Sequence, residues 1–137
     1  MNIDLIENPP QKLVDLLDNK IVEFNRQNRE INNRHPIAVT VKNSQGELVA
    51  GASGQTFGNW LHLSVLWVSE DLRGQNYGSK LLNKIEQSSK DRGCNQCLLD
   101  TLNFQAMPFY KKHGYEITWT QKNYPLTGCK YFMIKTL

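Results

Sequence analysis

Apolar residues recur at helical or strand spacings along most of the chain. Residues 2–7 alternate apolar and polar side chains before two prolines, and predict a short edge strand. Residues 37–41 and 48–52 alternate around the turn-forming residues 43–46, and predict a hairpin. Residues 11–28 hold apolar side chains three and four positions apart, which is typical of a helix with one buried stripe; they are Leu13, Leu16, Leu17, Ile21 and Phe24.

Residues 60–68 begin a second block of buried elements. They are too uniformly apolar for a strand with one solvent-exposed face, and predict a central strand buried on both faces. The spacing then becomes helical, and Gly93 ends this helix as a C-cap. One face of the predicted helix is formed by Tyr77, Leu81, Leu82 and Ile85.

A buried strand, a short helix and two final strands complete the predicted order, at residues 97–102, 106–113, 115–122 and 130–135. A strand, a helix and a second strand in succession require a parallel strand pair. We therefore expect an α/β (mixed α+β) fold. It would contain one mixed, mostly antiparallel sheet of six to seven strands, with helices on both faces.

The composition is that of one folded domain, residues 1–137. Hydrophobic residues make up 39% and charged residues 21% of the chain, which is enough apolar material for a core. No run approaches the roughly 18 apolar residues of a membrane span, and the N-terminus lacks a signal-peptide pattern, so we expect a cytoplasmic protein. Of the three cysteines, only Cys94 and Cys97 are close in sequence, which supports neither a disulfide framework nor a zinc site.

Positive charge gathers toward the C-terminus. The net charge is +3, and residues 101–137 carry five lysines against one acid, Glu116. This third of the chain would favour an anionic ligand. No basic stripe runs along one helix, so a nucleic-acid partner is disfavoured.

The segment from Val68 to Ser79 joins a predicted buried strand to a helix and contains Gly74 and Gly78. Glycines let the backbone approach a ligand closely, and the first turn of a helix presents unpaired N–H groups at the positive end of its dipole. Such a terminus binds phosphate. Taken alone, the segment is more typical of a plain helix entry, because it fits neither the P-loop nor the dinucleotide fingerprint.

A second motif, residues 103–115, favours a phosphate-binding role for this segment over a plain helix entry. Together the two segments resemble the GNAT superfamily of acetyl-coenzyme A-dependent N-acetyltransferases. Arg73 and Gly78 match the ends of that family's Arg/Gln-x-x-Gly-x-Gly/Ala motif, and Asn76 replaces the middle glycine, where asparagine tolerates left-handed backbone angles. The family's Asn-x-x-Ala-x-x-x-Tyr-x-x-x-Gly-Phe/Tyr motif is matched at every fixed position, by Asn103, Ala106, Tyr110, Gly114 and Tyr115.

The resemblance implies acetyl-coenzyme A as cosubstrate and no metal. Family members bind the pyrophosphate on the backbone amides of the first motif. In these proteins the strand before the first motif separates from the strand that follows the helix. The pantetheine arm of the coenzyme pairs with the strand edge exposed in this way. The implied coenzyme-binding residues are Leu66, Trp67, Val68, Arg73, Gly74, Gln75, Asn76, Tyr77, Gly78, Ser79, Asn103, Ala106, Phe109 and Tyr110.

Direct acetyl transfer to an amine needs a neutral nucleophile, a polarised thioester carbonyl and a proton for the departing thiolate. Tyr110 occupies the family position of the general acid; the alternative is a tyrosine that only packs beside the sulfur. A backbone N–H near Leu66 or Trp67 would hold the carbonyl oxygen. His35 and His113 look structural. The base is left open among three candidates, His62, Ser64 and Glu23.

The acceptor is also left open, since small amines, polyamines, aminoglycosides and protein amines all fit the sequence. The loop at residues 124–128 would close over it. The main alternative to an enzyme is a non-catalytic acyl-coenzyme A-binding or sensing module of the same fold. No membrane or nucleic-acid partner is expected, and a homodimer is compatible with the resemblance.

Overall fold

The computed structural model describes residues 1–137 and divides the chain into two compact units, residues 1–33 and residues 34–137. The prediction of a single domain over 1–137 stays a prediction. The N-terminal unit contains the helix α1 (Gln11–Arg26), which begins after Pro10. Its apolar residues lie on one stripe, as predicted, and none of them is buried.

The edge strand predicted at residues 2–7 is wrong. These residues form no strand and are exposed throughout. A strand is stable only when its backbone N–H and C=O groups pair with a neighbouring strand, and the six strands of the sheet all come from residues 35–136.

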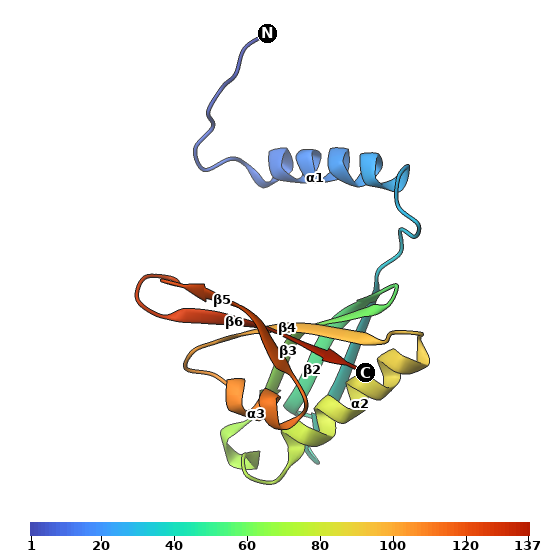
Figure 1. Cartoon of the computed structure of the whole chain (residues 1–137), viewed down its shortest axis with the longest axis vertical. Helices are drawn as coiled ribbons and strands as arrows, with labels where there is room; N and C mark the ends of the chain where they lie inside the picture. Colours follow the sequence, from blue (N-terminus) through green and yellow to red (C-terminus); the bar gives the residue numbers. More distant parts are fainter. The chain divides into compact units, whose positions relative to one another are not determined.

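Residues 34–137 form a six-stranded sheet with the order β1-β2-β3-β4-β6-β5 (Figure 1). All neighbouring strands are antiparallel except β3 and β4, which are parallel; this confirms the mixed sheet. The helix α2 (Tyr77–Asp91) connects the parallel pair, and α3 (Met107–Lys112) follows β4. The strands are β1 (His35–Lys42), β2 (Leu48–Phe57), β3 (Trp60–Val68), β4 (Gln96–Leu102), β5 (Glu116–Lys122) and β6 (Cys129–Thr136).

The core lies on one face of this sheet. Alternate residues of β3, Leu61 and Leu63, are buried there against α2, and Tyr110 of α3 belongs to the same cluster. The other face of β3 presents Trp60 and His62, which are exposed, so the prediction that this strand is buried on both faces is wrong. The reason is that α2 and α3 both pack on the core face of residues 34–137 (Figure 1).

The parallel pairing of β3 and β4 stops early. Only three residue pairs form, and the last joins His62 to Leu98. On the other side of β3, the register with β2 shifts between Ser53 and Gly54, which leaves Ser64 as an extra residue in β3. A Cβ atom at position 54 would overlap the His62 carbonyl oxygen, so this close approach requires glycine. Beyond the last pair, the edge of β3 that faces β4 has no strand partner.

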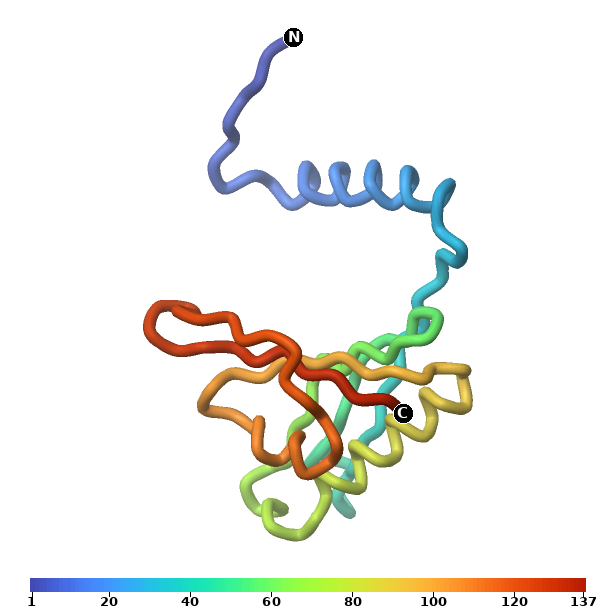
Figure 2. The backbone as a smooth tube through the Cα atoms, in the orientation of Figure 1, coloured from blue at the N-terminus to red at the C-terminus, as the bar shows by residue number.

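β4 keeps its other neighbour over its full length. Residues from Gln96 to Leu102 pair with β6, and β6 pairs in turn with β5. The backbone tube shows β5 and β6 continuing as one long hairpin beyond the end of β4 (Figure 2). The divergence of β3 from β4, here called the splay, therefore divides the sheet into two well-paired half-sheets, β1-β2-β3 and β4-β6-β5.

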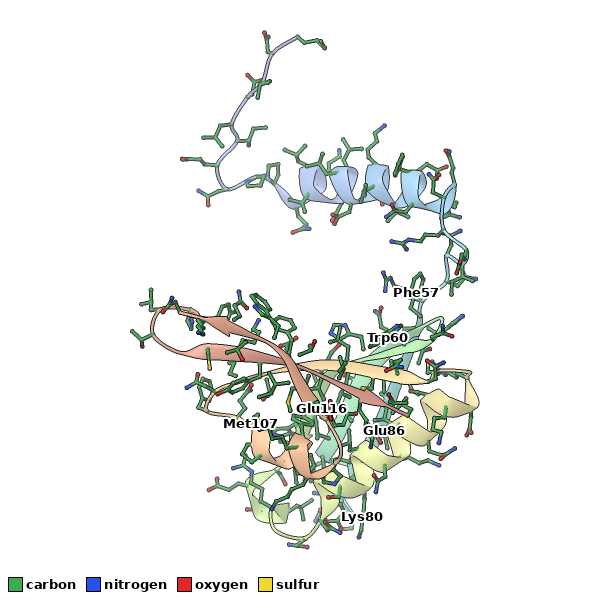
Figure 3. All side chains as sticks on the ribbon, in the orientation of Figure 1. Phe57, Trp60, Lys80, Glu86, Met107 and Glu116 are labelled. Carbon is green, nitrogen blue, oxygen red and sulfur yellow. The ribbon has the colours of Figure 1, made fainter.

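A buried polar cluster ties α2 to the second half-sheet. Glu86, labelled in Figure 3, accepts a hydrogen bond from the Tyr115 hydroxyl at 2.7 Å and an ion-paired one from Lys135 Nζ at 2.7 Å. Burial, with the nearby Cys97 thiol and Glu86 carboxyl, raises the pKa of Tyr115 well above its usual range. Because both oxygens of a buried carboxylate are satisfied, this contact fixes the angle of α2 on the sheet.

No helix is both long enough and apolar enough to cross a membrane.

Candidate functional site

The N-terminus of α2 is open to a ligand. Its N-cap residue, Asn76, adopts left-handed angles (φ 70°, ψ 15°), the backbone conformation that asparagine was expected to tolerate. No side chain caps the helix. The first N–H groups of α2, from Tyr77 to Ser79, therefore have no capping partner within the chain and stand at the positive end of the helix dipole.

These N–H groups border a pocket of about 550 Å³, here called the helix-end pocket. Arg73 lies at its rim, where Nε donates a hydrogen bond to the Val68 carbonyl at 3.3 Å. Lys112 of α3 adds a second positive charge, and no acidic residue lines the pocket. The pocket is formed by Val68, Leu72, Arg73, Gly74, Asn76, Tyr77, Gly78, Ser79, Phe109, Lys112 and His113.

His113 belongs to this pocket, although the sequence suggested only a structural role. Its Nδ1 lies 2.9 Å from the Phe109 carbonyl oxygen and its Nε2 lies 2.9 Å from Ser79 Oγ. A carbonyl can only accept, so Nδ1 carries the hydrogen, and in the neutral ring Nε2 accepts the Ser79 hydroxyl. This bridge links α3 to the first turn of α2, and no motif in the sequence signals it.

Gly78 lets the two helices approach closely at the same place. A Cβ atom at this position would lie 3.3 Å from the Phe109 ring. The Phe109 ring in turn packs against His113, with centroids 4.4 Å apart. Packing between α2 and α3 thus leaves little room for a side chain at the last glycine of the first motif.

A second pocket, of about 480 Å³, opens where β3 and β4 diverge; we call it the splay pocket. The predicted residues Leu66, Trp67, Ala106 and Tyr110 all line it. The full lining is Ser64, Val65, Leu66, Trp67, Asp100, Thr101, Leu102, Gln105, Ala106, Tyr110, Tyr124 and Lys130.

Tyr110 is the most buried phenol of this pocket, with 7% of its surface exposed. Burial, together with the neighbouring Cys97 and Asp100, raises the pKa of Tyr110 to about 12. Its hydroxyl therefore keeps its proton throughout the neutral and moderately alkaline range. A group in this state can donate a proton to a strong base formed beside it.

The coenzyme contact expected of Asn103 stays a prediction. Its side-chain Oδ1 accepts a hydrogen bond from the Cys129 N–H at 3.3 Å, and it lines neither pocket. Gln105, which the sequence did not single out, lines the splay pocket, and its Oε1 accepts a hydrogen bond from the Leu102 N–H at 2.7 Å. These two contacts hold the loop between β4 and α3.

The three candidate bases are separated in the structure. Ser64 lines the splay pocket, whereas His62 is exposed on the outer face of β3 and lines neither pocket. Glu23 lies on α1 in the N-terminal unit, 3.8 Å from Arg26 Nε. Their roles stay predictions.

Two charged residues of the splay pocket were missed by the sequence reasoning. Asp100 projects from β4, and Lys130 comes from β6 with its Nζ 4.2 Å from the Tyr124 ring centroid. The only signal for Asp100 was an acidic residue within a strand that was expected to be buried. Tyr124, in the loop expected to close over an acceptor, does line the pocket.

Comparisons with known proteins agree with these features. The model of the acetyltransferase (GNAT) family matches residues 5–115. A blasticidin-S acetyltransferase of Streptomyces morookaense is 33% identical over 94 residues, which cover 68% of this chain and 69% of that relative. The crystal structure of an acetyltransferase from Bacillus cereus ATCC 14579 has a TM-score of 0.88 and 34% identity, over 98% of both chains.

The same fold has been solved with coenzyme A. The PaiA N-acetyltransferase of Thermoplasma acidophilum in complex with coenzyme A has a TM-score of 0.65 and 18% identity, over 90% of this chain and 70% of that one. At this identity the likeness concerns the fold. The family model covers most of the chain, and the residues expected to bind the coenzyme line the two pockets, except Gln75 and Asn103. The chain therefore belongs to the acetyltransferase (GNAT) family.

Proposed function

We propose that this chain transfers an acetyl group from acetyl-coenzyme A directly to a primary amine. The observation that carries the proposal is the adjacency of the two pockets. Trp67 and Tyr110 line the splay pocket. Their neighbours in sequence, Val68 and Phe109, line the helix-end pocket. An anion-binding helix end thus adjoins an open strand edge that leads to a buried phenol.

The residues of both pockets fit the coenzyme. The uncapped N–H groups of Tyr77, Gly78 and Ser79, with Arg73 and Lys112, offer the donors and positive charge that a pyrophosphate requires. The unpaired edge of β3 beyond His62 offers backbone groups to an extended amide-containing arm, which would bind as an added strand.

Acetyl-coenzyme A supplies the activated acetyl group when bound. The neutral amine attacks the acetyl carbon, the carbon–sulfur bond breaks, and Tyr110 donates its hydroxyl proton to the departing sulfur. The proton that the amine nitrogen loses passes to solvent, and the Tyr110 phenolate regains a proton from solvent. Burial keeps the Tyr110 proton in place at neutral pH. A backbone N–H of β3 near Leu66 or Trp67 holds the carbonyl oxygen as negative charge develops on it. The chain thereby provides positioning, one acid and one oxyanion donor.

An amine panel with acetyl-coenzyme A tests the proposal directly. The panel contains alkylamines, α,ω-diamines, amino acids, peptides and blasticidin S, the last because a 33% identical relative is named for it. We expect release of free thiol that saturates with at least one amine class. Tight coenzyme A binding without thiol release for every amine would instead indicate a non-catalytic acyl-coenzyme A-binding module.

Tyr110→Phe should lower kcat by about 100-fold, the lower range for loss of a general acid. Coenzyme A affinity should stay within about threefold, because the ring and its packing remain. In the wild-type protein, kcat should show no decline between pH 7 and 10, since the pKa of Tyr110 is raised to about 12 and the phenol stays protonated. Stopped thiol-release assays measure both effects. Unchanged turnover in the variant, or a wild-type decline centred near pH 10, would contradict the assignment.

Asn76→Ala should weaken coenzyme A binding, whereas Asn76→Gly should preserve it. Residue 76 has a φ of 70°, which glycine adopts freely and alanine adopts at a cost of about 1 kcal/mol, equivalent to roughly fivefold in affinity. Calorimetric titration with coenzyme A measures the difference. Equal affinity of the two variants would mean that the left-handed angle at this position does not support the binding loop.

A further inference from the structure

Asp100 faces the splay pocket from the side opposite the catalytic phenol. On β4 its neighbours Leu99 and Thr101 are buried, whereas Asp100 is exposed, so its side chain projects from the outer face of the sheet. Tyr110 belongs to the core cluster on the inner face. Both residues line the same pocket, because the strands have separated at this point.

The Asp100 carboxylate forms no ion pair within the chain. The two ion pairs of the structure join Glu23 to Arg26 and Glu86 to Lys135. Asp100 is the only acidic residue that lines the splay pocket. The pocket's one cation, Lys130, instead places its ammonium over the rings of Tyr124 and Phe132.

An unpaired carboxylate in a pocket attracts a cation, and the position of this one indicates which cation. The amine that attacks the thioester must be neutral, and a carboxylate paired with it would stabilise its protonated, non-nucleophilic form. The reaction centre lies at Tyr110, on the inner face, whereas Asp100 lies on the outer face. The carboxylate is therefore suited to a second charged group of the acceptor.

We propose that Asp100 binds a second, non-reacting cationic group of the acceptor, so that the preferred substrates are amines with two positive charges. This inference rests on the proposed acetyl transfer to an amine. An ammonium or guanidinium on Asp100 would form a charge-assisted hydrogen bond and leave the other end of the molecule to reach Tyr110. Asp100 is thus a specificity-determining residue for the acceptor.

The test compares each α,ω-diamine of two to six carbons with the monoamine of the same length, using thiol release with acetyl-coenzyme A. In the wild-type protein, kcat/KM for the best diamine should exceed that for its monoamine by about tenfold or more, the gain from one charge-assisted contact. Asp100→Asn should bring this ratio close to one, because kcat/KM for the diamine falls by much more than kcat/KM for the monoamine. Asp100→Glu, which retains the charge, should keep a preference for the diamine.

Glu116→Gln is the matched control, because Glu116 is an exposed acid at the start of β5 that lines neither pocket. It removes the same charge and should leave the diamine preference intact. Asp100 is exposed and has no hydrogen-bonding partner, so its variants should fold; thermal melting and coenzyme A affinity check this.

Calorimetric binding of the same diamine to protein saturated with coenzyme A separates this inference from the proposed function. Loss of about tenfold in diamine affinity in Asp100→Asn supports the inference even if no amine is acetylated. Retention of the diamine preference and affinity in Asp100→Asn overturns it. An equal loss for diamine and monoamine also overturns it, because the carboxylate would then act on the reacting nitrogen.

Discussion

The early end of the pairing between β3 and β4 is the constraint on which the rest of the structure depends. A sheet edge normally carries a cost, because its unpaired N–H and C=O groups must find other partners. Here such an edge lies in the middle of the sheet. It persists because β3 is held by β2 on one side and β4 by β6 on the other. The extra residue at Ser64, made possible by Gly54, lies two positions beyond the last residue of β3 that pairs with β4.

Two further features complete the site around this opening. The connection from β3 to β4 through α2 brings an uncapped helix N-terminus beside the end of β3, and α3 supplies a buried phenol next to the exposed strand edge. The His113–Ser79 and Phe109–Gly78 contacts lock α3 onto α2, while Glu86 anchors α2 to β6. Each half of the site therefore depends on contacts made outside it. The proposed acetyl transfer would need few side chains for chemistry, since the coenzyme would bring the reactive group.

Elements whose apolar spacing is regular were predictable from the sequence. The bounds of β3 were expected as observed, and α2 and the β5–β6 hairpin differ by a residue or two at their ends. The position of Arg73 beside the N-terminus of α2, the left-handed angles at Asn76 and the position of Tyr110 beside Leu66 and Trp67 followed from motifs; their roles toward the coenzyme stay predictions. The prediction of a strand at residues 2–7 failed because an alternating pattern does not by itself provide a neighbouring strand to pair with. The prediction that β3 is buried on both faces failed because composition cannot tell which face a helix covers.

Other parts of the site lay beyond sequence reasoning because they depend on which strands become neighbours. Asp100 and Lys130 are 30 positions apart, and they share a pocket because β4 pairs with β6. His113 reaches Ser79 only through the close approach of α3 to α2. The hydrogen bond from the Cys129 N–H to Asn103 Oδ1 was not foreseen either, and the coenzyme contact of Asn103 stays a prediction. A motif identifies the residue type, whereas its partners are fixed by the packing of the elements.

Amide hydrogen exchange with and without coenzyme A tests the central claim, that the open edge of β3 receives the coenzyme as an added strand. Binding should slow exchange in residues 63–68 and 73–79, which contain that edge and the helix end. Exchange in β1, whose N–H groups already face β2 or lie away from both pockets, should not change. Protection confined to residues 73–79, with none in residues 63–68, would contradict the account.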